Sequence, residues 1–206
     1  VPTLLVRLLE SEALSAADTS SLEVFGYGSA PMPVDRLKQA LSRFGPIFAQ
    51  MYGLTETCAM ATCLRREDHL LDGPGAIRLG SCGRAVEGVE VRLVDAAGNL
   101  VQAGEVGEVV IRGPTLMPGY WDMPELTAET MRNGWFHSGD LAYQDEEGYI
   151  FLTDRKKDMI ISGGFNIYPK EVEEVLYTHP AVFECAVIGV SDPDWGEAVR
   201  AIVALR

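Results

Sequence analysis

The spacing of the apolar residues changes near Gly80, and this change constrains the fold more than any other feature of the sequence. Before Gly80, segments with helical spacing alternate with short apolar runs typical of buried strands, at residues 1–9, 22–27, 34–44 and 47–52. After Gly80, apolar and polar residues alternate over 90–94 and 106–112, which predicts half-buried antiparallel strands. We therefore predict an α/β layer over residues 1–79, followed by β hairpins that form a small barrel or sheet over 80–156.

Boundary signals support several of these elements. Pro33 marks the start of the second helix and Gly45 its end, and one face of that helix is apolar, with Leu37, Ala40, Leu41 and Phe44. A short helix is expected over 123–132, closed by Asn133-Gly134. Two further strands are expected over 135–143 and 149–153.

The charged run Arg155-Lys156-Lys157-Asp158 separates the hairpins from a new pattern. A short apolar run, a helix and two strands follow it, at residues 159–161, 169–177, 182–190 and 198–205. The helix is expected to turn Val172, Val175 and Leu176 inward. A charged hinge before a βαββ pattern indicates a domain boundary near Lys157, with one domain over 1–156 and part of a second over 157–206.

Composition excludes several classes of protein. The net charge of −13 argues against nucleic acid or an anionic membrane surface as a partner, and an apolar fraction of 47% argues against disorder. No apolar run approaches the roughly 18 residues that a membrane-spanning helix needs. The four cysteines lack metal-ligand spacing, which favours free thiols in a reducing compartment, with the cytoplasm as the default. Because the sequence opens on Val1 without an initiator Met, we expect it to be a piece of a longer chain.

Three motifs in a fixed order carry a resemblance to a known family. They are Tyr52-Gly53-Leu54-Thr55-Glu56, Gly134-Trp135-Phe136-His137-Ser138-Gly139-Asp140 and Asp154-Arg155-Lys156-Lys157-Asp158-Met159-Ile160. Together they make the chain similar to the adenylate-forming superfamily, most closely to its fatty-acyl and aryl coenzyme A ligases. The resemblance covers essentially all 206 residues. It implies the carboxyl-terminal part of the family's large domain, with an α/β layer and a small β-barrel, followed by part of its mobile α+β domain.

The resemblance also implies a reaction. Members of the family use ATP to convert a carboxylic acid into an acyl-adenylate, and the thiol of coenzyme A then displaces AMP. Thr55 would donate a hydrogen bond to the α-phosphate, and Glu56 would bind Mg²⁺, a cation that prefers carboxylate oxygen. Taken alone, these residues are better interpreted as a polar turn after a strand; the other motifs favour the functional interpretation.

The nucleotide-binding residues are implied in the same way. An adenine-side loop would be formed by Gly28, Ser29, Ala30 and Pro31, and the base would lie against Tyr52, next to Gly53 and Leu54. Asp140 would accept both ribose hydroxyls, and Arg155 would complete the cradle around ribose and phosphate. The structural alternatives are an ordinary strand-to-helix turn for residues 28–31, an Asp140 that caps its own turn, and an Arg155 that is only a surface charge.

Further positions match functional sites of the family. Lys157 falls at the hinge about which the second domain swings, and Gly163 and Gly164 would leave room for the pantetheine arm of coenzyme A. Tyr27 and Ala59 are candidates for the acyl pocket. His137, within the second motif, is interpreted as a structural residue rather than a base.

Alternatives remain open at this stage. Leu54 and the run over 161–169 favour a coenzyme A ligase over a peptide-synthetase adenylation domain or a luciferase-like enzyme. The family's phosphate-cradling loop and its carboxyl-terminal lysine have no match in the sequence, so we expect these 206 residues alone to be inactive. A non-catalytic module that binds AMP or an acyl-adenylate is the main alternative. The substrate acid is expected to be fatty, and aromatic acids remain open.

Overall fold

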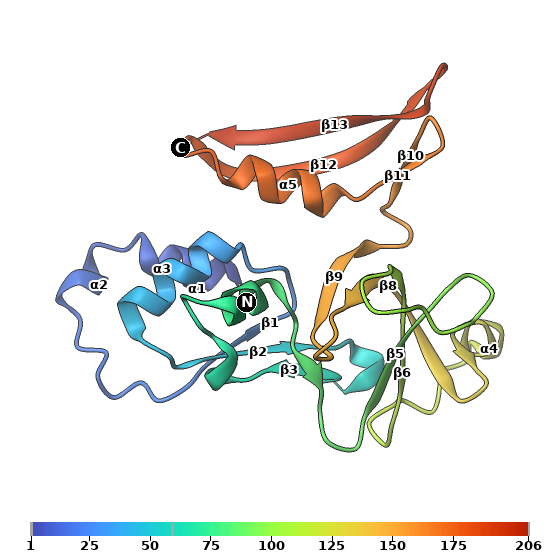
Figure 1. Ribbon diagram of the computed structural model, residues 1–206, viewed down its shortest axis with the longest axis horizontal. Coiled ribbons are helices and arrows are strands. Elements are labelled where there is room, and N and C mark those ends of the chain that lie inside the picture. Colours follow the sequence, from blue (N-terminus) through green and yellow to red (C-terminus); the bar gives the residue numbers. More distant parts are fainter. Residues whose placement is uncertain (1, 59, 206) are drawn as a thin grey trace.

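The computed structural model describes residues 2–58 and 60–205 and arranges their strands in three sheets (Figure 1). The first sheet has the order β1-β2-β3-β4, formed by Phe25–Gly28, Phe48–Tyr52, Thr62–Leu64 and Arg84–Ala85. Strands β1 and β2 run parallel, and β3 and β4 continue the sheet antiparallel. The helical segments of this layer are α1 (Pro2–Leu9), α2 (Ala13–Ala16), α3 (Val34–Phe44) and the 3-10 turns η1 (Thr55–Thr57), η2 (Arg66–Asp68) and η3 (Pro74–Gly80).

Helix α3 packs the apolar face that the sequence predicts into the core of this layer. Its buried residues Leu37, Ala40 and Leu41 belong to the same cluster as Phe48. The predicted strand over 22–27 is wrong at its start. Strand β1 begins only where Phe25 pairs with Phe48, and residues 22–24 are exposed because they precede that pairing.

The second sheet is strongly curved and forms half a barrel (Figure 1). Its order is β5-β6-β8-β7, with β9 paired to β8, and the strands are Glu90–Val94, Gly107–Arg112, Met131–Arg132, Trp135–Gln144 and Ile150–Arg155 in chain order. All of its pairs are antiparallel. The long strand β8 pairs with β6 on either side of a register shift, with β7 at its start and with β9 over its second half, so all three strands are joined through β8.

The helix predicted over 123–132 is shorter in the structure. Helix α4 covers Pro124–Thr130, and the next two residues form β7 instead. Asn133 and Gly134 have φ of +53° and +77°, the left-handed backbone of a tight hairpin turn. This pair therefore joins β7 to β8 rather than closing a helix.

The third sheet has the order β11-β10-β13-β12 and is antiparallel throughout. Its strands are Ile160–Ser162, Phe165–Ile167, Val182–Asp192 and Gly196–Leu205, and α5 (Pro169–Tyr177) contacts β12. The pattern after the charged run is thus ββαββ rather than the predicted βαββ. Val175, expected to point inward, is 69% exposed. In Figure 1 this sheet lies above the other two, joined to β9 by a single segment.

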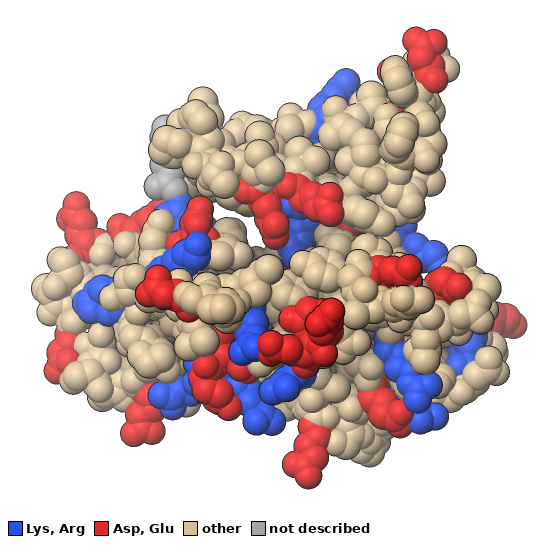
Figure 2. All heavy atoms as spheres, viewed as in Figure 1, with Lys and Arg blue, Asp and Glu red and all other residues tan. Residues whose placement is uncertain are grey.

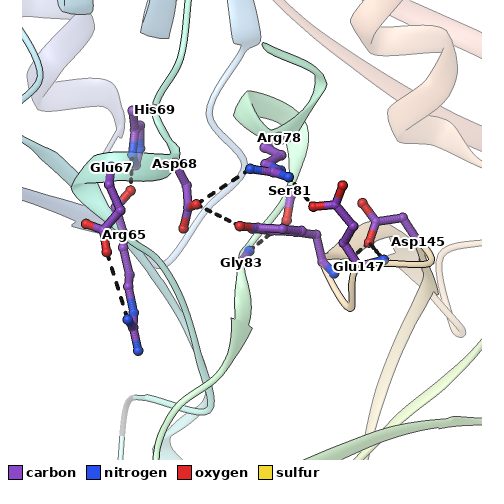
Figure 3. Close-up of polar contacts among 10 residues, drawn as sticks. Arg65, Glu67, Asp68, His69, Arg78, Ser81, Gly83, Asp145 and Glu147 are labelled. Atoms are coloured by element: carbon purple, nitrogen blue, oxygen red, sulfur yellow. Dashed lines mark hydrogen bonds and ion pairs between the residues drawn. The ribbon is translucent and has the colours of Figure 1, made fainter. Parts of the chain in front are cut away.

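A set of polar contacts joins η2 and η3 of the α/β layer to the hairpin between β8 and β9 (Figure 3). The buried carboxylate of Asp68 accepts a hydrogen bond of 2.7 Å from the Tyr149 hydroxyl and lies 3.8 Å from the Arg78 guanidinium. Arg78 also pairs with Glu147 and lies over the Tyr149 ring. We call Asp68, Arg78, Glu147 and Tyr149 the junction network.

The architecture confirms the predicted fold class, an α/β layer followed by a curved β sheet and a further α+β part. Among the residues that the structure describes, no helix is long and apolar enough to cross a membrane.

Candidate functional site

A cavity of about 660 Å³ lies where the three sheets meet. Its walls come from the loop after β1, from β2, β8 and β9, and from β10, α5, β12 and β13. Most of the predicted nucleotide residues line it, namely Ser29, Ala30, Pro31, Tyr52, Gly53, Leu54, Asp140 and Arg155, together with the predicted hinge residue Lys157. Figure 2 shows the hollow between the upper part and the body of the molecule, where basic and acidic side chains meet.

Asp140 forms the polar centre of this wall. The residue is 8% exposed, and its Oδ2 accepts a hydrogen bond of 2.6 Å from the Tyr52 hydroxyl. Arg155 is its register partner across β8 and β9, with Nε 3.4 Å from Oδ1. Burial raises the pKa of Asp140, while the Tyr52 hydroxyl and the Arg155 charge act to lower it. Burial and the neighbouring carboxylate raise the pKa of Tyr52, so that its hydroxyl stays a neutral donor.

The loop at the end of β1 approaches β2 closely. Gly28 pairs with Met51, and a Cβ at this position would lie 2.2 Å from the Met51 carbonyl oxygen. Only glycine fits there. Ser29 then takes a left-handed backbone with φ of +68°, which turns the chain into the cavity wall. Gly28 itself does not line the cavity.

Thr55 and Glu56 lie in η1, immediately beyond the cavity lining. Thr55 is exposed. The Glu56 side chain accepts a hydrogen bond of 2.7 Å at Oε1 from the Tyr120 hydroxyl. Burial, followed by the Glu56 carboxylate, raises the pKa of Tyr120 to about 12. The sequence does not indicate Tyr120, because its contact with Glu56 spans 64 residues and no local pattern predicts it.

The predicted pantetheine glycines form the turn between β10 and β11. Gly163 and Gly164 have φ of +58° and +85°, and neither lines the cavity. A Cβ on Gly163 would lie 2.5 Å from the Trp195 ring, whereas a Cβ on Gly164 would meet nothing within 4 Å. The Trp195 ring therefore gives Gly163 a structural reason to be glycine.

Three other residues named from the sequence lie away from the cavity or outside the described residues. Tyr27 is 1% exposed and contacts His69 rather than the cavity. Ala59 lies outside the described residues. His137 Nδ1 lies 3.4 Å from the buried carboxylate of Glu108, within the second sheet.

Lys170 and Asp154 also line the cavity, and the sequence analysis did not select them. Lys170 Nζ donates to the Leu152 carbonyl oxygen at 2.5 Å, and its backbone N–H donates to Asp154 Oδ2 at 3.2 Å. These bonds tie the start of α5 to β9. The only signal in the sequence was the position of Lys170 beside Pro169, at the start of a helix.

Within residues 2–58 and 60–205, no group of three or more His, Cys, Asp or Glu could hold a metal ion. Glu56 is a single carboxylate near the cavity. Mg²⁺ that arrives with a nucleotide needs only one or two protein carboxylates besides the phosphates. The single carboxylate of Glu56 therefore fits a Mg²⁺ ion that arrives with a nucleotide.

Comparison with known proteins defines the class. Residues 1–121 match the family described as AMP-binding enzyme, and residues 171–206 match the family described as AMP-binding enzyme C-terminal domain. The medium/long-chain-fatty-acid–CoA ligase FadD8 of Mycobacterium tuberculosis is 46% identical over 206 residues, which are 100% of this chain and 35% of that protein. A feruloyl-CoA synthase of Amycolatopsis sp. is 47% identical over 98% of this chain and 40% of its own length.

A solved structure gives the same result. The amide bond synthetase McbA from Marinactinospora thermotolerans superposes with a TM-score of 0.92 at 41% identity, over 100% of this chain and 41% of that one. The fold and these matches thus place the chain in the adenylate-forming superfamily. The chain belongs to the AMP-binding enzyme family, and it spans well under half the length of these three relatives.

Proposed function

We propose that this chain is part of an ATP-dependent acid:CoA ligase, which activates a carboxylic acid as acyl-AMP and transfers the acyl group to coenzyme A. The observation that carries the proposal is the buried Asp140 carboxylate, which Tyr52 and Arg155 hold on the wall of the cavity. Two of the relatives named above are CoA ligases, which supports the same reaction.

In this proposal the cavity binds the adenosine part of the nucleotide. Asp140 accepts hydrogen bonds from both ribose hydroxyls. Its two oxygens offer about four lone-pair positions, and the contacts to Tyr52 and Arg155 leave room for two more donors. The adenine lies between the Tyr52 ring and the small residues at 29–31, which line the same cavity. Arg155, whose side chain is 60% exposed, can turn toward the phosphates.

The phosphates extend toward η1. The exposed Thr55 hydroxyl donates to the α-phosphate, and Glu56 binds Mg²⁺ through its carboxylate. When bound, Mg²⁺ would neutralise charge on the phosphates as the acid attacks the α-phosphorus. Thr55 and Glu56 are adjacent in one 3-10 turn, so a single rigid element presents both groups.

In this proposal, the third sheet and α5 move relative to the first two sheets. We propose that Lys157 is the hinge residue, at the boundary between residues 1–156 and 157–206, and that Gly163 and Gly164 approach the pantetheine arm in a second pose. Exposure of Lys157 at the cavity edge supports the hinge, since an exposed backbone segment can change φ and ψ without loss of core contacts.

The relatives support proposals for the substrate acid and its acceptor. We propose a fatty acid as the substrate, with aromatic acids as the second class, because a fatty-acid ligase and a feruloyl-CoA synthase are 46% and 47% identical to this chain. An amine acceptor is the alternative to coenzyme A, favoured by the likeness to an amide bond synthetase. The four free cysteines support a cytoplasmic location.

The test is ATP–pyrophosphate exchange by the complete protein, with a panel of fatty and aromatic acids. Exchange with an acid, followed by thioester formation when coenzyme A is added, would support the proposal. Amide formation with an amine and no reaction with coenzyme A would favour the alternative acceptor. AMP binding without exchange for any acid would favour a non-catalytic binding module. Because these residues cover 35% of the M. tuberculosis relative, we expect the 206-residue chain alone to give no exchange.

A further inference from the structure

Glu56 is held at two points by the segment between β6 and α4. The backbone N–H of Met117 donates to the Glu56 carbonyl oxygen at 2.8 Å, and the Tyr120 hydroxyl donates to its Oε1 at 2.7 Å. One segment thus locates both the main chain and the side chain of Glu56. The candidate metal ligand is therefore not a freely rotating surface glutamate.

Tyr120 is itself fixed by the start of α4. Its backbone N–H donates to Thr127 Oγ1 at 2.9 Å, and the Thr127 hydroxyl donates to the Met123 carbonyl oxygen at 2.9 Å. The preceding Gly119 lies so close to Thr127 that an added Cβ would be 2.8 Å from Thr127 Cγ2. A residue larger than glycine at position 119 would therefore clash with Thr127 and displace the backbone next to Tyr120.

The chemistry of the donor matters for a cation ligand. A tyrosine hydroxyl is a neutral donor, so it engages one carboxylate oxygen and leaves the negative charge of Glu56 intact. A lysine or arginine in its place would compete with the cation. Among the described residues, no protein donor contacts the second oxygen of Glu56, Oε2. Within the described residues, Oε1 thus has a protein donor and Oε2 has none.

We infer that Tyr120 is a positioning residue that holds Oε1 of Glu56 so that Oε2 faces the divalent cation bound with ATP. This inference rests on the proposed function, because it concerns the same metal ligand. Without the hydroxyl, the carboxylate regains rotational freedom that metal binding must then remove. Loss of such a partner of a ligand typically weakens metal binding by about 10–100-fold.

The test compares Tyr120→Phe with the wild type in the complete protein. In ATP–pyrophosphate exchange at saturating ATP and acid, we expect the Mg²⁺ concentration for half-maximal rate to rise about tenfold or more, with the rate largely recovered at high Mg²⁺. A second readout is independent of turnover: Mn²⁺ binding in the presence of a non-hydrolysable ATP analogue, followed by electron paramagnetic resonance. Thr127→Val, which removes the anchor of Tyr120, should shift both readouts in the same direction by less.

Tyr143→Phe is the matched control. Its ring stacks on Phe151 at 4.8 Å, and no protein partner of its hydroxyl is found among the described residues, so this change should leave both readouts unchanged. An equal loss of rate for Tyr120→Phe at every Mg²⁺ concentration, with unchanged half-saturation and Mn²⁺ binding, would mean a purely structural role and overturn the inference.

Glu56→Gln separates this inference from the proposed function. If Glu56→Gln weakens Mn²⁺ binding and Tyr120→Phe does not, Glu56 is a ligand and only the role of Tyr120 is overturned. If neither variant changes Mn²⁺ binding, the metal site itself is refuted. If the wild type shows no exchange with any acid, the proposed reaction fails, and the Mn²⁺ measurement still decides the role of Tyr120.

Discussion

Removal of one oxygen atom, in Tyr27→Phe, tests how the α/β layer is held together. The Tyr27 hydroxyl lies 3.0 Å from His69 Nε2, and both residues are buried. The other ring nitrogen, Nδ1, lies 2.7 Å from the Arg65 carbonyl oxygen, a contact visible in Figure 3. Because a carbonyl only accepts, Nδ1 must carry the proton. Nε2 is then an acceptor, and Tyr27 is its donor.

The size of the effect follows from this assignment. The variant keeps the ring, which lies edge-on to Phe48, so no cavity forms. It leaves Nε2 of His69 buried without a donor, which costs about 1–3 kcal/mol in the free energy of unfolding. At about 2–4 °C per kcal/mol for a protein of this size, the melting temperature should fall by about 2–12 °C.

The pH dependence gives an independent check. Burial lowers the pKa of His69, so the fold disfavours its protonated form. A lowered pKa contributes stability that is present above the ordinary value of 6.5 and is lost as pH falls through the lower value of the folded state. Protonation also breaks the bond from Tyr27. The difference between variant and wild type should therefore be smaller at pH 5 than at pH 8.

Thermal and urea unfolding at both pH values would measure this, with Tyr143→Phe as the control for loss of a tyrosine hydroxyl. Equal melting temperatures of Tyr27→Phe and wild type at pH 8 would refute the assignment of the His69 tautomer. A change in the preferred acid, without a change in stability, would instead support the prediction that Tyr27 lines the acyl pocket.

Three further predictions concern the cavity and its surroundings. Asp140→Ala should weaken AMP binding by at least about tenfold, because each hydrogen bond to a charged group contributes about 1.5–3 kcal/mol, and calorimetry would measure it. Gly163→Ala should displace the Trp195 ring, which lies 2.5 Å from the added Cβ, and unchanged tryptophan fluorescence would contradict this. Glu108→Gln removes the carboxylate that lies 3.6 Å from Lys156 Nζ, so trypsin should cleave the charged run after β9 faster, in a time course against wild type.

The fold was predictable from the sequence where local signals agree. Helix α3 combines an apolar face with a proline at its start and Gly45 at its end, and the structure follows all three signals. Helix α4 was predicted too long, because Asn133-Gly134 can end a helix or turn a hairpin, and only the pairing of β7 with β8 decides. The exposure of Val175 depends on what α5 contacts, which helical spacing alone does not specify.

The site was predictable only as a set of motifs. The resemblance named Tyr52, Asp140 and Arg155, and the structure brings all three to one cavity. Neither spacing nor composition indicates that the Tyr52 hydroxyl binds Asp140, across 88 residues. Tyr120 was missed for the same reason, since its contact with Glu56 exists only after the second sheet has folded beside the first.

The position of the cavity between sheets has a consequence for its geometry. Tyr52 lies on the first sheet and Asp140 on the second, so the bond between them crosses the junction of the two sheets. Tyr149 of the junction network contacts the α/β layer from the position just before β9 begins. Arg155 is the last residue of β9 and pairs with Asp140. One strand therefore carries the structural contact at its start and the site residue at its end. Strand β9 pairs with β8 from Ile150 to Arg155, with a register shift between Leu141 and Ala142, so the contact of Tyr149 and the Arg155–Asp140 pair lie at opposite ends of one hydrogen-bonded ribbon.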